Sequence, residues 1–152
     1  MAKIKQDKFG IRVMKEEDLE SIVKIDAKVT GTRRDDYYER KMQTMLDSRG
    51  SIGTSLVADN DGKVVAFIMG NIYTGEFGIP QSTASLDTIG IDPAFAKSGI
   101  GSLLLEEFVR NLKAAGVENV QTLVDWNNLP LLRFFNKGGF VPSKTINLEK
   151  KI

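Results

Sequence analysis

The segment from residue 89 to residue 102, IGIDPAFAKSGIGS, has the residues best suited to bind a charged ligand. Its apolar start predicts a strand, and a loop then leads into a helix that begins near Gly99 and Gly101. The first backbone N–H groups of a helix are unpaired and lie at the positive end of its dipole, so they bind anions. Glycines let a ligand approach the backbone closely, and Lys97 would add positive charge. The spacing suits a pyrophosphate, but the glycines can equally serve a tight turn and close helix–sheet packing.

Two common nucleotide-binding motifs fit this segment poorly. A phosphate-binding P-loop requires Gly-Lys-Ser/Thr, but Gly101 is followed by Ser102 and Leu103. A dinucleotide-binding fingerprint requires a third glycine, and Leu104 occupies that position. A protein that binds ATP or NAD is therefore the least favoured of the hypotheses.

The composition excludes several kinds of catalysis. The 152 residues contain no Cys and no His, which rules out thiol nucleophiles, disulfides, Ser-His-Asp triads and most transition-metal sites. Proton transfer must therefore use carboxylates, Lys, Tyr, water or backbone-held solvent, and we expect no metal site. Because 21 Lys and Arg face 20 Asp and Glu, the net charge is only +1, which argues against broad nucleic-acid binding.

The hydrophobic pattern predicts a single α/β domain over residues 1–152, with a mixed central β-sheet flanked by helices. The expected order is β-α-α-β-β-β-α-β-α-β, and the turn Asp59-Asn60-Asp61-Gly62 predicts a hairpin. The predicted elements are strand 9–13, helices 15–29 and 35–46, strands 55–58, 64–73 and 83–91, helix 99–115, strand 120–124, helix 129–137 and strand 140–148.

The N-terminal residues and the apolar runs bear on where the protein works. Residues 1–8 are polar and basic, which predicts a flexible segment rather than a targeting signal. No apolar run approaches the length of a membrane span. We therefore expect a soluble cytoplasmic protein with no membrane partner. Its aliphatic strands and an open sheet edge are compatible with a homodimer.

Two motifs resemble those of a known enzyme family. The strand exit Ile91-Asp92-Pro93 and the turn Gly99-Ile100-Gly101 match the family motif Arg/Gln-x-x-Gly-x-Gly/Ala and the residues before it. A second family motif, Asn followed seven residues later by Tyr and then by Gly-Phe, finds Asn128, Phe135 and Gly139-Phe140. With these motifs in this order, the sequence resembles the GNAT superfamily of acetyl-CoA-dependent N-acetyltransferases over about residues 9–152.

The resemblance implies acetyl-CoA (CoA) as co-substrate and an amine-bearing acceptor substrate. Backbone N–H groups of the turn would hold the pyrophosphate, and the preceding strand would pair with the pantetheine arm. A backbone N–H near Ile89 would form an oxyanion hole for the thioester carbonyl, since such a contact strengthens as negative charge develops. The implied cofactor-binding residues are Ile89, Gly90, Ile91, Ala96, Lys97, Ser98, Gly99, Ile100, Gly101, Ser102, Asn128 and Phe135.

The sequence departs from the family pattern at two of these positions. Ala96 stands where the family has Arg or Gln, so one polar phosphate contact is missing and Lys97 would compensate. Phe135 stands where the family has the Tyr that often protonates the departing thiolate, and a phenyl ring has no proton to donate. Because a thiol has a pKa of about 8.5, water suffices as the proton donor, and the general acid stays unassigned.

Asp87 is the candidate general base, because many family members use a carboxylate on the strand before the phosphate turn. In a regular strand its side chain would lie on the same side as Ile89 and Ile91. The alternative is that Asp87 is a solvated or hydrogen-bonded strand residue without a catalytic role.

The resemblance places the acceptor wall at residues 29–38 and at the loop 74–82. Asp26, among apolar neighbours, needs a partner and is expected to pair with Arg33 or Arg34 or to face the acceptor. Tyr37 and Tyr38 are expected to pack, with one of them available to line a pocket.

The leading hypothesis is an N-acetyltransferase that moves an acetyl group from acetyl-CoA to a primary amine by direct attack in a ternary complex. The acceptor would be a small amine, an amino acid or a protein amine. The second hypothesis is a GNAT-fold module that binds CoA and regulates without turnover, which the departures at Ala96 and Phe135 support.

Overall fold

The computed structural model describes residues 9–47, 54–73 and 82–152, so the predictions for residues 1–8, 48–53 and 74–81 lie outside the described residues. The chain alternates strands and helices in the expected order up to residue 137. Its elements are β1 (Gly10–Val13), the 3-10 helix η2 (Glu16–Asp18), α1 (Leu19–Thr30), α2 (Asp35–Asp47), β2 (Ser55–Asn60), β3 (Lys63–Tyr73), β4 (Thr83–Ile91), the 3-10 helix η4 (Pro93–Phe95), α3 (Ile100–Ala114), β5 (Asn119–Thr122) and α4 (Leu129–Lys137).

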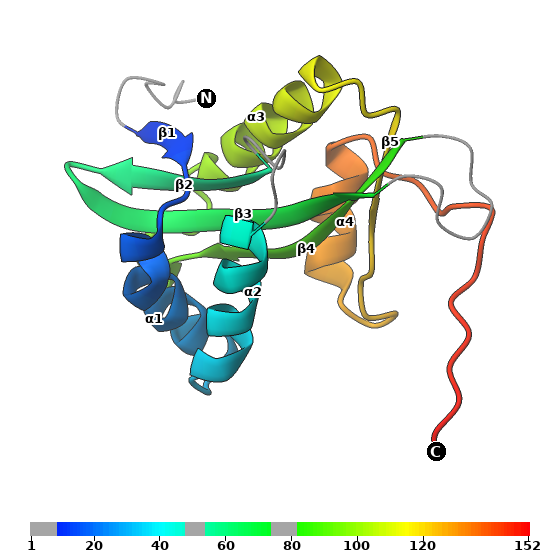
Figure 1. Cartoon of the computed structure of the whole chain (residues 1–152), viewed down its shortest axis with the longest axis horizontal. Coiled ribbons are helices and arrows are strands. Elements are labelled where there is room, and N and C mark those ends of the chain that lie inside the picture. Colours follow the sequence, from blue (N-terminus) through cyan, green and yellow to red (C-terminus); the bar gives the residue numbers. More distant parts are fainter. Residues whose placement is uncertain (1–8, 48–53, 74–81) are drawn as a thin grey trace.

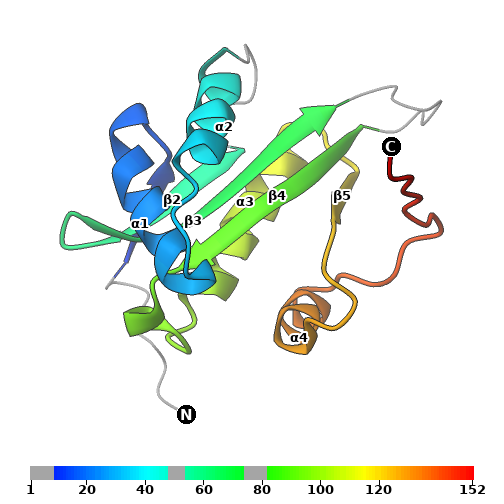
Figure 2. The same cartoon turned by 90° about the horizontal axis from the view of Figure 1, so that it is seen from below.

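The strands form one mixed sheet in the order β1-β2-β3-β4-β5. The first four strands pair antiparallel, and β5 pairs parallel to β4, as the crossover through α3 requires. Helices α1 and α2 cover one face of the sheet and α3 covers the other (Figures 1 and 2). The expected α/β architecture is therefore confirmed.

Each face of the sheet has its own hydrophobic core. On the α3 face, Leu104 and Phe108 of α3 pack with Leu56, Ile68 and other strand residues. On the opposite face, Ile22 of α1 and Tyr38 of α2 pack with Phe67 of β3 and its neighbours. Because alternate residues of β2 and β3 point into the two cores, these central strands are apolar along most of their length.

Two tight turns follow directly from local chemistry. In the β2–β3 hairpin, Asp61 and Gly62 have φ angles of 53° and 81°, and Asn60 pairs with Lys63 across a two-residue turn. Positive φ at both positions is typical of type I′ turns, which confirms the predicted hairpin. Helix α1 ends at Gly31, whose φ of 82° is a left-handed conformation that glycine adopts without strain.

The predicted final strand at residues 140–148 is wrong, because these residues form no strand in the structure. The apolar alternation there is that of a strand, but a strand also needs a neighbour to accept and donate backbone hydrogen bonds. Val141, Ile146 and Leu148 are all exposed, and Pro142 has no N–H to donate. Figure 1 shows this segment leaving the body of the molecule after α4.

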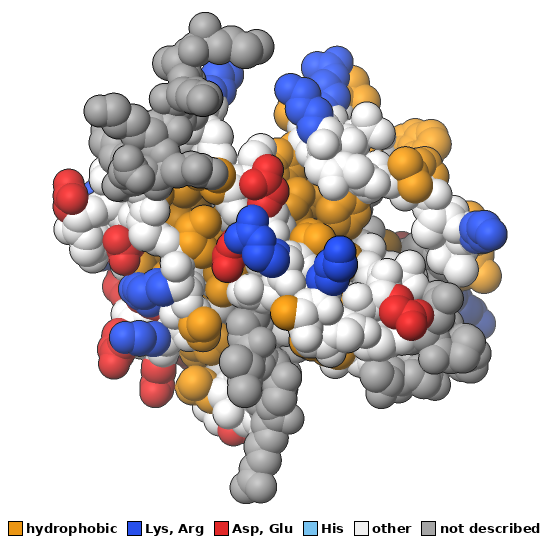
Figure 3. Space-filling view, turned by 90° about the horizontal axis from the view of Figure 1, so that it is seen from above, with side chains coloured by type: hydrophobic (Ala, Val, Ile, Leu, Met, Phe, Trp, Pro, Cys, Tyr) orange, Lys and Arg blue, Asp and Glu red, His pale blue; other side chains and the backbone are white. Residues whose placement is uncertain are grey.

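The described helices include none that is both long enough and apolar enough to cross a lipid bilayer. Figure 3, seen from above relative to Figure 1, shows Lys and Arg side chains mixed with Asp and Glu across the surface. This mixture agrees with a net charge close to zero.

Candidate active site

The turn between β4 and α3 has the geometry of an anion site. Lys97 and Gly99 have φ angles of 61° and 82°, and Gly99 is the residue immediately before α3. The preceding loop is fixed by Asp92, whose carboxylate accepts from the Ala94 amide at 3.0 Å and from Lys28 Nζ at 2.9 Å. A buried carboxylate with two donors therefore holds the loop in place at the end of β4.

The first turn of α3 leaves backbone donors unpaired. The ladder of α3 starts with the Leu103 amide, which donates to the carbonyl of Gly99 at 3.1 Å. Within the part of the chain that is described, the amides of Gly99, Gly101 and Ser102 have no protein acceptor. These N–H groups, at the positive end of a helix of four turns, are the donors expected for a pyrophosphate.

The two positions of the turn require glycine for different structural reasons. Gly99 has the positive φ that the turn needs. Gly101 is buried, and a Cβ there would lie 2.6 Å from Cδ1 of Ile91 and 3.3 Å from Cε2 of Phe134. The packing explanation therefore holds for Gly101, which lets α3 approach both β4 and α4. This packing role leaves the unpaired amides of the turn available to bind a ligand.

Strands β4 and β5 separate beside this turn. Their pairing ends at Leu86 and Thr122, where the Thr122 hydroxyl donates to the Leu86 carbonyl at 2.9 Å. Strand β4 continues to Ile91 without a strand partner on that side among the described residues. Figure 2 shows β5 turning away from β4 toward α4. The backbone of residues 87–91, including Ile89, Gly90 and Ile91, therefore lies where an extended ligand arm could pair with it.

A β-bulge at Asp87 changes which way the strand's side chains face. In the β3–β4 register, Met69 pairs with Thr88 and Gly70 pairs with Leu86, so Asp87 is an extra residue. Leu86 and Ile89 both pack on the α3 core, whereas the Asp87 carboxylate contacts a side chain of α2. The expectation that Asp87 lies on the same side as Ile89 and Ile91 is therefore wrong, because the bulge breaks regular alternation.

The Asp87 carboxylate is the centre of a polar cluster at the bulge. It accepts from Lys41 Nζ at 2.6 Å, from Asn71 Nδ2 at 2.9 Å and from the Ser85 hydroxyl at 2.6 Å. Asp87 is thus hydrogen-bonded and ion-paired, yet only half-buried. The cluster fixes its carboxylate at the point where β4 and β5 separate.

Sequence analysis missed Lys41 and Asn71. Local periodicity would have given the faces on which they lie. Lys41 is one helical turn after Tyr37, and Asn71 lies on the same face of β3 as Met69. What no local pattern gives is the docking of α2 over β3 and β4, which brings them to Asp87.

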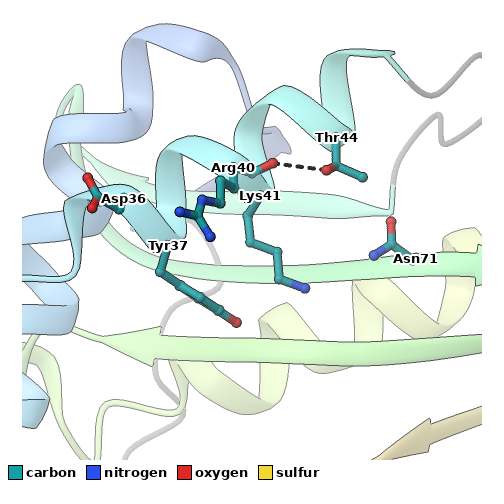
Figure 4. Close-up of a pocket in the computed structure, with 6 residues that line it drawn as sticks. All are labelled: Asp36, Tyr37, Arg40, Lys41, Thr44 and Asn71. Atoms are coloured by element: carbon teal, nitrogen blue, oxygen red, sulfur yellow. Dashed lines mark hydrogen bonds between the residues drawn. The ribbon is translucent and has the colours of Figure 1, made fainter.

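A cavity of about 510 Å³ opens next to this cluster and is lined by Asp36, Tyr37, Arg40, Lys41, Thr44 and Asn71 (Figure 4). In Figure 4 the side chains of Tyr37 and Lys41 extend from α2 toward the strands. The Lys41 ammonium lies 5.8 Å from the centre of the Tyr37 ring, a cation–π distance. The predicted acceptor wall at residues 29–38 therefore borders this cavity through Asp36 and Tyr37. Of the other predicted wall, residues 74–82, all but Ser82 lie outside the described residues.

The family model described as the acetyltransferase (GNAT) family matches residues 14–140 of this chain, which include all of the elements above except β1. The chain belongs to the GNAT acetyltransferase family.

Solved structures of the same GNAT fold span nearly the whole chain. The aminoglycoside N-acetyltransferase AAC(6')-Iy, in complex with CoA, has 18% identity and a TM-score of 0.76, covering 94% of each chain. The ribosomal-protein-S18-alanine N-acetyltransferase from Escherichia coli has 19% identity and a TM-score of 0.73, covering 90% of this chain and 79% of that one. A transcriptional regulator from Bacillus halodurans C-125 has 21% identity and a TM-score of 0.77, covering 95% and 99%. These structures show the fold, and the family match supports acetyl transfer as the class of reaction.

The second GNAT motif lies on α4. The Asn128 side chain accepts from the Leu131 amide at 3.3 Å, so it caps the helix, with Pro130 in the first turn. Phe135 is buried, and its ring lies 5.3 Å from that of Phe134 and 5.1 Å from that of Phe140. In this GNAT chain Phe135 is therefore a core residue, and it has no hydroxyl to donate a proton.

The other residues considered near the GNAT acceptor wall form a structural network. Arg34 donates to both oxygens of Asp26, at 2.8 and 2.6 Å, and the Tyr38 hydroxyl donates to Asp26 at 2.8 Å. Burial favours a higher pKa for Asp26, but the hydrogen bonds from Arg34 and Tyr38 outweigh it, and the pKa lies below its ordinary value. Burial, and then the Asp26 carboxylate, raise the pKa of Tyr38. The expected Asp26–Arg34 pair is confirmed, and the network ties α1 to α2.

Proposed function

We propose that this GNAT protein transfers an acetyl group from acetyl-CoA to a primary amine by direct attack in a ternary complex. The observation that carries the proposal is the juxtaposition at the end of β4. The Asp87 cluster, the backbone of residues 87–91, which has no strand partner on the β5 side among the described residues, and the unpaired amides at the start of α3 follow one another along the chain from β4 into α3. Proton transfer, pairing of an extended arm and anion binding need these three features in this order.

The turn and the strand would divide the binding of the co-substrate between them. The unpaired amides of Gly99, Gly101 and Ser102, with the side chain of Lys97, would hold the pyrophosphate. The backbone of residues 89–91 would pair with the pantetheine arm, and Asn128 would lie at the far side, on α4. Ala96 adds no polar contact, so this chain relies on backbone donors and on Lys97.

The chemistry required of the chain's own residues is limited. Acetyl-CoA supplies the activated acetyl group as a thioester. The acceptor enters as an ammonium, and Asp87 takes its proton, directly or through one water, so that the nitrogen lone pair can attack. The C–N bond forms as the C–S bond breaks, the nitrogen gives its second proton to solvent, and the thiolate leaves. Solvent protonates the thiolate, because Phe135 cannot. Lys41 and Asn71 keep the Asp87 carboxylate in place.

Two linked measurements test this function. Thermal unfolding is measured with acetyl-CoA, NAD and ATP, each at saturating concentration. A ligand at 100 times its Kd adds about 2.7 kcal/mol of stability, which is on the order of 5–11 °C for a domain of this size. We expect this shift with acetyl-CoA alone. An equal or larger shift with NAD or ATP would instead support a nucleotide binder.

Thiol release is then measured with a panel of primary amines. The assay has no background from the protein, because the chain contains no Cys. We expect amine-dependent release of CoA thiol. Stabilisation by acetyl-CoA without any turnover would favour the regulatory CoA-binding module. Two observations agree with that alternative: Phe135 is a buried residue with no proton to donate, and the Asp87 carboxylate is already paired with Lys41.

A further inference from the structure

The cavity beside the Asp87 cluster is where the acceptor of the proposed reaction would lie. Two residues of its wall contact the candidate base: Lys41 Nζ lies 2.6 Å and Asn71 Nδ2 lies 2.9 Å from the Asp87 carboxylate. An amine presented to Asp87 would therefore leave the rest of its molecule in this cavity. The charges of the cavity wall then determine which acceptors bind well.

Three charged side chains line the cavity, and Arg40 has the charge that the fold does not use. Lys41 forms an ion pair with Asp87 at 2.6 Å, so these two charges offset each other. Asp36 lies in the first turn of α2, where the helix dipole stabilises a carboxylate. Arg40 lies in the middle of α2, and within the described part of the chain no carboxylate pairs with its guanidinium. Even Asp36, four residues earlier on the helix, does not pair with it, although this spacing allows an ion pair.

Most of the other described arginines do have a carboxylate partner. Those that pair with a carboxylate are Arg12, Arg33, Arg34 and Arg110. Arg40 and Arg133 have no such partner among the described residues, and of these two only Arg40 lines the cavity. A guanidinium presents its N–H donors as a planar fork that matches the two oxygens of a carboxylate. Arg40 therefore gives the cavity an unused, bidentate site for an anionic group.

The wall of the cavity favours an acceptor with a single negative charge. A carboxylate has one charge and matches one guanidinium, whereas a dianionic phosphate would be repelled more strongly by the Asp36 carboxylate on the same wall. An acceptor with several ammonium groups would bring like charge to Arg40 and Lys41. The free guanidinium of Arg40 thus selects a carboxylate over both alternatives.

The position of Arg40 allows one small molecule to reach both groups. Arg40 and Lys41 are consecutive residues of α2, and Lys41 contacts Asp87 directly. In the view of Figure 4 the Lys41 side chain extends toward the strands, whereas the Arg40 guanidinium stays close to α2. The cavity therefore has an inner end at the Asp87 cluster, suited to the amine, and a second end at Arg40, suited to a carboxylate.

We propose that the acceptor is an amino acid or a similar small molecule with both a primary amine and a carboxylate. Arg40 binds the carboxylate while the amine faces Asp87. Arg40 is then a specificity-determining residue without a part in the proton transfer. The acetylation of this acceptor rests on the proposed function, whereas the binding of its carboxylate by Arg40 does not.

Paired acceptors test the role of Arg40. Each amino acid of a panel, such as glycine and β-alanine, is compared with its own amide, which lacks the negative charge. Comparing kcat/KM in wild type and in Arg40→Gln cancels the different reactivities of the two amines. We expect Arg40→Gln to lower kcat/KM for the acids by about 10- to 100-fold, the usual value of a hydrogen bond to a charged group, and to leave the amides nearly unchanged. Arg40→Lys, which keeps the charge but loses the fork, should fall between wild type and Arg40→Gln.

The matched control is Arg110→Gln, the same change at an exposed position of α3, on the other face of the sheet. It should leave the preference for acids over amides as it is in wild type. Thermal unfolding of all variants shows that they stay folded. Equal losses for acids and amides in Arg40→Gln would overturn the proposal, as would a wild type that acetylates spermidine but no amino acid.

Calorimetry separates this inference from the proposed function. The same amino acids are added to protein saturated with CoA, which has no acetyl group to transfer. Wild type should bind them at least about tenfold more tightly than Arg40→Gln. Such binding without turnover in the acetyl-CoA assay would support the Arg40 site and refute the proposed function. Turnover of other amines, with no Arg40-dependent binding of amino acids, would overturn the inference and leave the function standing.

Discussion

At the scale of single residues, the environment of Asp87 is the feature that most needs an explanation. Its carboxylate binds three side-chain donors from three places in the sequence, on α2, β3 and β4 itself. A purely structural strand residue does not need to sit on a bulge, next to a cavity, where two parallel strands separate. Bulges commonly re-aim a side chain beside an active site, and this bulge turns Asp87 toward Lys41 and Asn71, which line the cavity.

Replacing the Asp87 carboxylate tests the assignment of the base. Asp87→Asn is expected to lower kcat by about 10²–10⁴-fold, the usual contribution of general-base catalysis, while KM for acetyl-CoA changes little. The loss should shrink as pH rises toward the pKa of the acceptor amine, because more of the amine is then already uncharged.

The control for this variant is Asp61→Asn in the β2–β3 turn, a position where Asn tolerates the positive φ and which is remote from the site. It should keep wild-type rates. A pH-independent loss in Asp87→Asn, or a loss explained by lower thermal stability, would remove Asp87 as the base.

Asp26 is predicted to act on stability instead of rate. Asp26→Asn weakens the hydrogen bonds from Arg34 and Tyr38, which should cost about 1–3 kcal/mol at pH 7. Because the pKa of Asp26 lies below 3.8 in the folded protein, its contribution is complete well above pH 3.8 and is lost as pH falls through the folded pKa. Urea unfolding at pH 7 and at pH 3 should show the difference between wild type and variant shrinking at pH 3. A constant difference would contradict this account.

At the scale of elements, close approach of β3, β4 and α3 sets the geometry of the site. A Cβ at Gly70 would lie 2.5 Å from the Ser85 carbonyl oxygen and 2.7 Å from the Phe108 ring. Both neighbours are rigid, one as backbone of β4 and the other as a fully buried ring of α3. The strand that carries Asp87 can lie where it does only because residue 70 has no side chain.

Gly70→Ala should therefore destabilise the protein by about 1–3 kcal/mol, the usual cost of overpacking a core. That corresponds to a fall in Tm on the order of 2–12 °C, measured by calorimetry. The matched control is Gly10→Ala in β1, where the nearest atom to a Cβ is the Asp59 carboxylate at 3.3 Å, the end of a side chain that can move. Equal effects of the two substitutions would show that close approach at Gly70 is not limiting.

At the start of helix α4, substitutions of Asn128 can distinguish its role as a helix cap from a role in ligand binding. Asn128→Ala should cost about 1 kcal/mol of stability, because the Leu131 amide loses its acceptor, whereas Asn128→Ser should retain most of it. If Asn128 also contacts the pantetheine arm, both variants should raise the Kd for acetyl-CoA. Unchanged affinity in Asn128→Ser would limit Asn128 to the capping role.

At the scale of the whole molecule, two cores share one sheet. Alternate residues of β2 and β3, such as Leu56 and Val57, belong to opposite cores. Unfolding one core therefore removes the support of the other, which favours a single cooperative unit.

Calorimetry of the whole chain should show one transition, with an enthalpy on the order of 100 kcal/mol for 152 residues. Acetyl-CoA should move that transition as a whole, since its proposed site spans β4, α3 and α4. Two separable transitions, or a ligand shift confined to one of them, would contradict a single domain.

Most of the element order could be predicted from the sequence, because helix periodicity, the hairpin turn and the glycines that end helices are local signals. The turn before α3 was predictable for the same reason, because Lys97, Gly99 and the start of α3 lie close together in the sequence. The side on which Asp87 lies was not, since the bulge is a property of the β3–β4 register and leaves no mark in the spacing of β4 alone.

What the sequence alone determined is thus the local chemistry: a strand, a glycine turn and a helix start that together resemble the GNAT phosphate site, and a chain without Cys or His. What only the tertiary structure decided is which distant groups meet. Lys41 reaches Asp87 across 46 residues because α2 docks over β3 and β4, and residues 140–148 form no strand because they pair with no edge of the sheet. Local preferences act between near neighbours, whereas register, docking and pairing depend on contacts between segments that only the folded chain brings together.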